Sequence, residues 1–121
     1  MMRGWSILFW VAAAFNVIIG LALMIFPGDD IGHDFDPGTL PVRAMGWFIA
    51  VFGVGYAMVA NAPDRHHGIV KLGVIGKLGF VVLMLAAWSS AVIPTSQFVT
   101  SLLDLPWAAA FLIFLRREAR S

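Results

Sequence analysis

The chain has 121 residues, of which 60% are apolar and 12% are charged, and its mean hydropathy is +0.88. A soluble domain of this length cannot hide so much apolar surface, so we predict an integral membrane protein with a single domain. The net charge of +1, without a groove-sized basic patch, argues against a nucleic-acid partner, and the lack of cysteine excludes disulfides, thiolate metal sites and thiol catalysis.

Residues 5–26 form the first predicted transmembrane span, 22 residues without a charge. This apolar run is longer than that of a typical signal peptide, and no small-x-small cleavage site follows it, so we predict a retained helix. Asn16 lies at its midpoint, with Ala12 and Gly20 four residues away on either side. Because small residues let helix backbones approach, this stripe is predicted to face another helix.

The segment 28–41 is a polar connection rich in glycine, proline and aspartate, which predicts a loop. Four aspartates and His33 fall within residues 29–36. Carboxylate and imidazole groups bind divalent cations, so His33, Asp34 and Asp36 are candidate metal ligands. The spacing of an EF-hand calcium loop is missing, however, and a solvated acidic loop is the interpretation that we favour.

Residues 42–60 form the second predicted span, which carries a seam of small residues suited to close helix packing. The seam consists of Gly46, Ala50, Gly53, Ala57 and Ala60. A short polar turn, 61–68, then joins it to an antiparallel neighbour. The turn contains two adjacent histidines, which point in different directions and make a poor metal site, so we expect it to contact lipid headgroups instead.

The third predicted span, 69–93, is apolar over 25 residues but contains Lys77, with Gly73 and Gly76 expected on the same side. The fourth, 98–115, contains Pro106, which disfavours helical geometry at Leu105 and predicts a kink or a break near these residues. A helix that began at Asp104 would leave an apolar part rising only about 16 Å, too short to cross a membrane.

The loops predict the orientation of these four spans. One side carries six basic residues and the other carries only Arg43, a bias that places both termini in the cytoplasm. The six are Arg3, Arg65, Lys71, Arg116, Arg117 and Arg120. We therefore predict an all-α fold, an up-down-up-down bundle of four transmembrane helices in a bacterial-type inner membrane, with the first three packed through small residues.

Asn16, Lys77 and Asp104 are the candidate residues of a polar cluster near mid-membrane. Counting along the spans places Lys77 and Asp104 roughly 10 Å apart in depth, so a direct bridge requires tilt or a water molecule. Arg43, at the outer end of the second span, is the competing partner for Asp104. The alternatives are a ligand pocket beside a broken helix and a purely structural ion pair, since buried charges are commonly paired.

Three functions are compatible with this pattern, and no residue identifies a cofactor. The first is a non-catalytic accessory or assembly subunit that packs against a larger membrane complex or a second copy of itself. The second is a binder of a lipid or other hydrophobic small molecule through the polar cluster. The third, ranked last, is a proton-coupled transporter or channel in which Asp104 titrates. The layout is similar to that of DoxX-like and other bacterial four-helix proteins, although no motif transfers a role to any residue.

Overall fold

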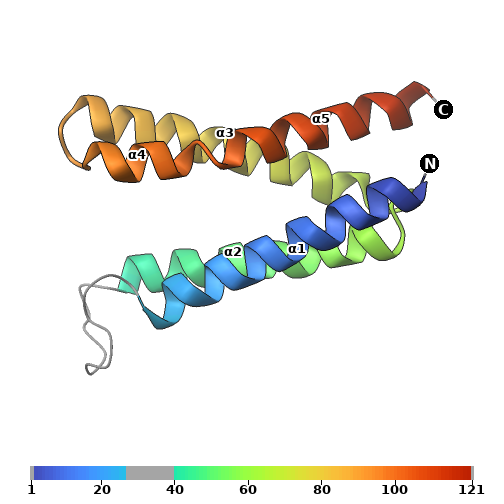
Figure 1. Cartoon of the computed structure of the whole chain (residues 1–121), viewed down its shortest axis with the longest axis horizontal. Helices are drawn as coiled ribbons and strands as arrows, with labels where there is room; N and C mark the ends of the chain where they lie inside the picture. The colour runs from blue at the N-terminus through green and yellow to red at the C-terminus, as the bar shows by residue number, and fades with distance from the viewer. Residues whose placement is uncertain (1, 27–39, 121) are drawn as a thin grey trace. The chain divides into compact units, whose positions relative to one another are not determined.

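The structure is a computed structural model that describes residues 2–26 and 40–120. Within these ranges the regular elements are all helices (Figure 1): α1 (Met2–Ile25), α2 (Leu40–Asn61), α3 (His67–Ser89), α4 (Thr95–Ser101) and α5 (Asp104–Arg120). By length and composition, four segments are able to cross a membrane, namely Arg3–Ile25, Leu40–Asn61, His67–Ser89 and Thr95–Ala119. The all-α prediction is confirmed for the described residues, and the four segments indicate a multi-pass membrane protein.

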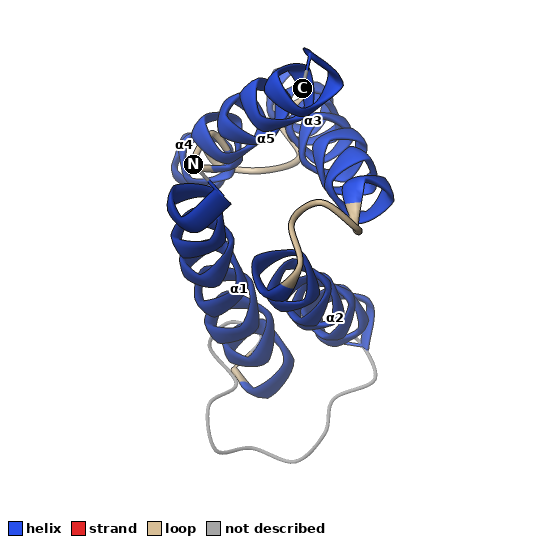
Figure 2. Cartoon of the chain, turned by 90° about the vertical axis from the view of Figure 1, so that its right-hand side faces the viewer, coloured by secondary structure: helices blue, strands red, loops and turns tan. Residues whose placement is uncertain are grey.

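The chain is divided into two compact units, residues 1–65 and residues 66–121. In the first unit α1 and α2 lie side by side and run antiparallel (Figures 1 and 2). In the second unit α3 runs antiparallel to α4 and α5, which follow one another along its length. Each unit is therefore a helical hairpin, and we call them the first and second hairpin.

The first hairpin is packed backbone against backbone through glycine. A Cβ atom added to Gly20 would lie 2.5 Å from the carbonyl oxygen of Gly46 and from the amide nitrogen of Ala50. A Cβ added to Gly53 would lie 2.6 Å from a methyl group of Val17. These distances leave no room for a side chain, so the predicted close packing of the small residues of α1 and α2 is confirmed.

A hydrogen bond and a buried stripe extend the same contact along α1. The hydroxyl of Ser6, near the start of the helix, donates to the carbonyl oxygen of Ala60 at the end of α2. The buried residues of α1 recur every three or four positions, as one face of a helix requires. They are Phe9, Ala12, Ala13, Asn16 and Gly20.

The second hairpin has a similar buried face with larger side chains. On α3 the buried residues include Val70, Gly73, Val74 and Lys77, and on α5 they are Ala108, Phe111 and Phe114. Gly73 therefore shares the face of Lys77 as predicted, but Gly76 is exposed. The expectation for Gly76 is wrong because adjacent helical residues point about 100° apart.

Trp88 closes the far end of the second hairpin. Its indole ring stacks on Phe98, with ring centroids 4.6 Å apart and planes 3° from parallel, and its Nε1 donates to Thr95 Oγ1 at 3.0 Å. Between these residues α3 ends in a Schellman motif. The amide of Val92 donates to the carbonyl of Ala87, the amide of Ala91 donates to that of Trp88, and Ala91 has a positive φ of 59°.

Ala91→Gly is expected to stabilise the second hairpin by about 1 kcal/mol, because glycine takes the left-handed conformation without the steric conflict of a Cβ atom. The free energy of unfolding in detergent, measured by denaturant titration, tests this. Ala91→Val is the control and should destabilise, since a β-branched side chain is disfavoured at positive φ. Equal stability of the three proteins would contradict the motif.

The fourth span is interrupted at Leu102 and Leu103 rather than kinked near Pro106, so that predicted kink is not confirmed. The ring of Pro106 would clash with the carbonyl of Leu102, four residues earlier, in a regular helix. The proline nitrogen also has no hydrogen to donate to that carbonyl. The amide of Leu105 donates to Leu102 instead, at 3.0 Å, in a tighter turn. Pro106 itself lies in the first turn of α5, where its missing amide costs nothing.

The end of the third helix and both ends of the fourth span also differ from the prediction. The third helix ends at Ser89 rather than at residue 93, and the fourth span covers Thr95–Ala119 rather than 98–115. An α-helix does begin at Asp104. The sequence argues against this start, because the apolar part that follows is too short to cross a membrane by itself. The missing length is supplied by α4 on the other side of the interruption, so that the whole segment reaches 25 residues.

Candidate functional site

Lys77 of α3 and Asp104 of α5 form an ion pair inside the second hairpin. The Nζ atom of Lys77 lies 3.3 Å from Oδ1 of Asp104. The side chain of Lys77 is only 8% exposed and that of Asp104 is 22% exposed. As the first residue of α5, Asp104 also lies where the helix dipole favours a carboxylate.

The direct contact follows from the register of the hairpin. Trp88 lies beside Thr95 and Phe98 at one end, and His67 lies beside Glu118 at the other. With the observed helix ends, Lys77 and Asp104 differ in depth by about four residues, or roughly 6 Å. The flexible stem of lysine covers that difference, so neither tilt nor a bridging water is needed.

Asn16 and Arg43 each make a hydrogen bond within the first hairpin. The Nδ2 atom of Asn16, which is 6% exposed, donates to the carbonyl oxygen of Ile49 at 3.1 Å. Arg43 donates from Nη1 to the carbonyl oxygen of Met24 at 2.7 Å. This bond satisfies one of the last carbonyls of α1 with a cation, as the end of a helix favours. A ligand site that unites Asn16 with Lys77 and Asp104 stays a prediction.

His67 and Glu118 form a second polar pair, at the other end of the second hairpin. The Nε2 atom of His67 lies 3.3 Å from Oε1 of Glu118, and its ring packs edge-on against Phe114, with centroids 5.7 Å apart. The side chain of Glu118 is only 11% exposed. Sequence reasoning missed this pair, although a short turn between antiparallel helices places the start of α3 beside the end of α5.

The candidate metal ligands His33, Asp34 and Asp36 lie outside the described residues. Within residues 2–26 and 40–120, no group of three or more histidine, aspartate or glutamate side chains is arranged to hold a metal ion. In the same ranges, every buried side-chain nitrogen and oxygen has a hydrogen-bond partner.

Comparisons of the chain with protein-family models, with curated proteins and with solved structures found no significant match. The roles of its residues therefore follow from their geometry. An ion pair in a span joins two helices, because separating it would leave a charge in lipid. The same charges are also the groups that would bind the polar end of an amphipathic ligand.

Proposed function

We propose that the chain is a non-catalytic accessory or assembly subunit that packs against a larger membrane complex or a second copy of itself. The observation that carries this proposal is that polar side chains in the spans form hydrogen bonds within their own hairpin. Asn16, Lys77 and Asp104 each bond to a group of their own hairpin. These bonds stabilise helix packing, and such a hairpin presents mainly apolar side chains to its surroundings.

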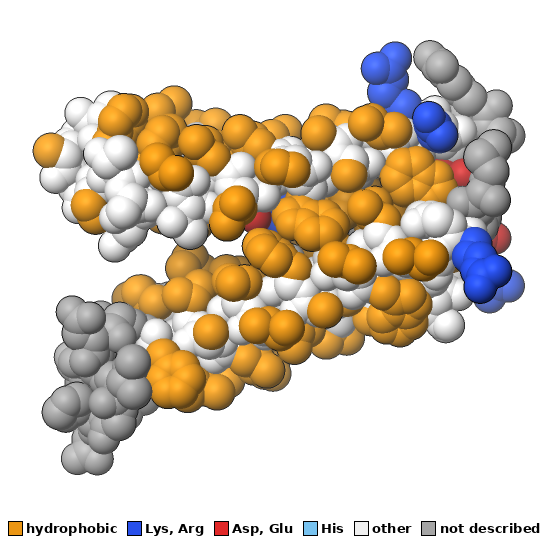
Figure 3. Space-filling view, in the orientation of Figure 1, with side chains coloured by type: hydrophobic (Ala, Val, Ile, Leu, Met, Phe, Trp, Pro, Cys, Tyr) orange, Lys and Arg blue, Asp and Glu red, His pale blue; other side chains and the backbone are white. Residues whose placement is uncertain are grey.

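On the face that Figure 3 shows, hydrophobic side chains cover most of the length, and the visible lysine and arginine side chains gather mainly at one end. On α3, Gly76 and Gly79 are exposed, and a Cβ atom added to either would have no neighbour within 4 Å. The exposed Leu72 and Ile75 precede them on the same helix. This open segment supports the proposal, because exposed glycine lets a partner helix approach closely.

Purification of the full chain in a mild detergent, with mass spectrometry of what co-elutes, tests the proposal. A second protein in stoichiometric amount, or a dimer of the chain, is expected. Gly79→Leu should reduce this association, because leucine fills the open space on α3. Gly4→Leu, at another exposed glycine with open space around it, is the control and should not. A monomer that elutes without a protein partner would overturn the assembly role.

A binder of a lipid or other hydrophobic small molecule is the second candidate function. The interruption of the fourth span at Leu102 and Leu103 lies directly before Asp104, and broken helices at membrane depth commonly line a site. One small molecule enriched in the purified wild-type protein and absent from Lys77→Met would favour this function. A proton-coupled transporter or channel that uses Asp104 is the third hypothesis.

The orientation is part of the proposal: an up-down-up-down bundle in a bacterial-type inner membrane with both termini in the cytoplasm. The chain has no cysteine, so each introduced thiol is the sole target of a membrane-impermeant reagent. Asp30→Cys and Asp36→Cys should be labelled in intact cells, because the proposed orientation places both positions on the outer side. Arg65→Cys and Arg120→Cys should be labelled only after lysis. Labelling of all four in intact cells would contradict this topology.

A further inference from the structure

The two hairpins differ in charge. Residues 66–121 contain five lysines or arginines and two acidic residues, a net charge of +3, whereas residues 1–65 contain three and five, a net charge of −2. The small net charge of the whole chain therefore conceals a basic second hairpin. Such an asymmetry indicates an electrostatic partner for that part of the molecule.

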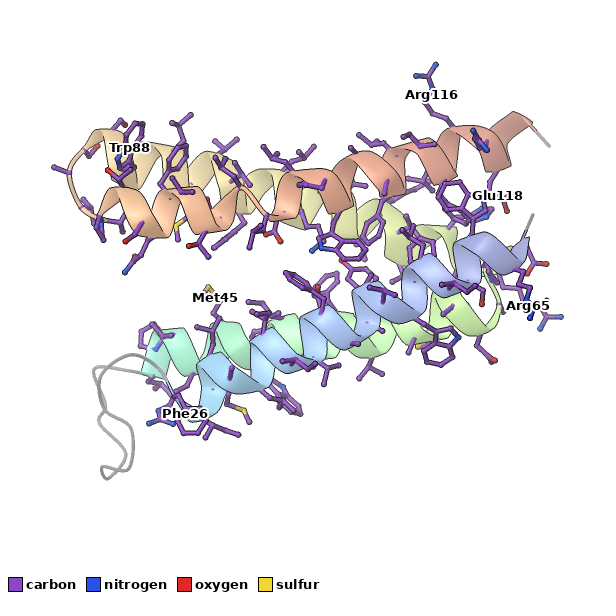
Figure 4. All side chains as sticks on the ribbon, in the orientation of Figure 1. Phe26, Met45, Arg65, Trp88, Arg116 and Glu118 are labelled. Carbon is purple, nitrogen blue, oxygen red and sulfur yellow. The ribbon has the colours of Figure 1, made fainter. Side chains whose placement is uncertain are left out.

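Both acidic residues of the second hairpin are engaged in pairs. Asp104 bonds to Lys77 at mid-span, and Glu118 bonds to His67 at the end of the hairpin. Glu118 lies on the inner side of α5, while Arg116 extends away from the helix (Figure 4). Among the described residues, none forms an ion pair with Lys71, Arg116 or Arg117, all of which are exposed. We call these three residues the basic end.

The position of the basic end matches the depth of lipid headgroups. Arg116 and Arg117 directly follow the apolar run of α5 that ends at Leu115. Lys71 lies one turn into α3, near enough to the helix start for its long side chain to reach the interface. The bond between His67 and Glu118 shows that the start of α3 and the end of α5 meet, so the three cations lie at one end of the hairpin.

We propose that the basic end binds the headgroup of an anionic phospholipid. Clustered lysine and arginine side chains next to a transmembrane helix attract anionic lipid, by roughly 1 kcal/mol for each residue near the surface. Glu118 bonds to His67 and pairs with none of the three cations, so its carboxylate reduces the charge of the basic end only from +3 to +2. The inference is independent of the accessory role, since lipid recognition at the interface requires no protein partner.

Native mass spectrometry of the full chain in detergent, titrated with phosphatidylglycerol or with phosphatidylcholine, tests the proposal. Phosphatidylglycerol is expected to bind about 100-fold more tightly, at about fivefold for each of the three cations. Lys71→Gln/Arg116→Gln should weaken its binding about 25-fold, at about fivefold for each charge removed, and should leave phosphatidylcholine unaffected. Lys71→Arg/Arg116→Lys keeps both charges and should retain the preference, which separates recognition from a loss of folding.

Arg3→Gln/Arg65→Gln is the matched control, because it removes two exposed charges from the other hairpin. It should leave the affinity for phosphatidylglycerol within about twofold of the wild type. Equal losses in the two glutamine variants would overturn the proposal in favour of diffuse attraction to net charge. Equal binding of the two lipids would overturn it outright. Displacement of phosphatidylglycerol by millimolar inorganic phosphate would also overturn it, since the site would then select free phosphate.

Discussion

Gly20→Ala is expected to destabilise the first hairpin by about 3 kcal/mol. The added methyl group would lie 2.5 Å from backbone atoms of Gly46 and Ala50, where no flexible side chain can move aside. The helices must then separate by about 1 Å to restore ordinary contact distances, which weakens the packing along the whole seam. Overpacking typically costs about 1–3 kcal/mol, and a backbone neighbour places this variant at the upper end.

Gly4→Ala is the matched control on the same helix. A Cβ atom there has nothing within 4 Å, and alanine favours a helix over glycine by up to about 1 kcal/mol. The same chemical change should therefore be neutral or stabilising at residue 4. Unfolding of purified protein in mixed micelles of increasing denaturing detergent gives both free energies. If both variants are as stable as the wild type, α1 and α2 do not pack through Gly20.

Lys77→Met and Asp104→Asn should each destabilise the protein by several kcal/mol, and the double variant should be less destabilised than the sum predicts. Removal of one partner leaves the other charge buried in the span, which typically costs about 3–5 kcal/mol. Replacement of both removes the stranded charge as well, and such changes are often close to neutral. Thermal unfolding in detergent of the wild type and the three variants provides the complete double-mutant cycle.

A second cycle, with Arg43→Gln and Asp104→Asn, is the control. Arg43 bonds to Met24 in the first hairpin, so its effect should add to that of Asp104→Asn within about 0.5 kcal/mol. Additive effects in the Lys77 cycle would show that the lysine reaches the interface by itself. Coupling in the Arg43 cycle instead would identify that arginine as the partner of Asp104.

The sequence predicts the parts of the fold that depend on composition and on the helical repeat. Long apolar runs give four segments able to cross a membrane, because the thickness of the bilayer sets their length. The spacing of Ala12, Asn16 and Gly20, and of Gly46, Ala50 and Gly53, gives the packed face of the first hairpin. These features are local, and a single helix is enough to reveal them.

Features that depend on where helices end were harder to predict. Residues 91–93 are apolar and therefore extend the predicted third span. The chain in fact turns at Ala91. The sequence does not indicate this turn, because the glycine that usually marks such a helix end is absent. That error placed Lys77 and Asp104 further apart in depth than they are, so the predicted ion pair was expected to need tilt or a bridging water. Pro106 correctly indicates that the fourth span is disturbed. Its steric effect, however, falls on the carbonyl of Leu102, four residues earlier.

The pairing of Lys77 with Asp104 has a consequence for the order in which the chain is made. The lysine precedes its partner by 27 residues. At about 5–20 residues per second, the ribosome needs roughly 1–5 seconds to synthesise that interval. During this time α3 carries a lone charge that costs about 2.5–3.5 kcal/mol at the centre of a membrane. Pairing with Asp104 removes this cost once the following segment has entered the membrane, so the ion pair stabilises the complete hairpin and not the single helix α3.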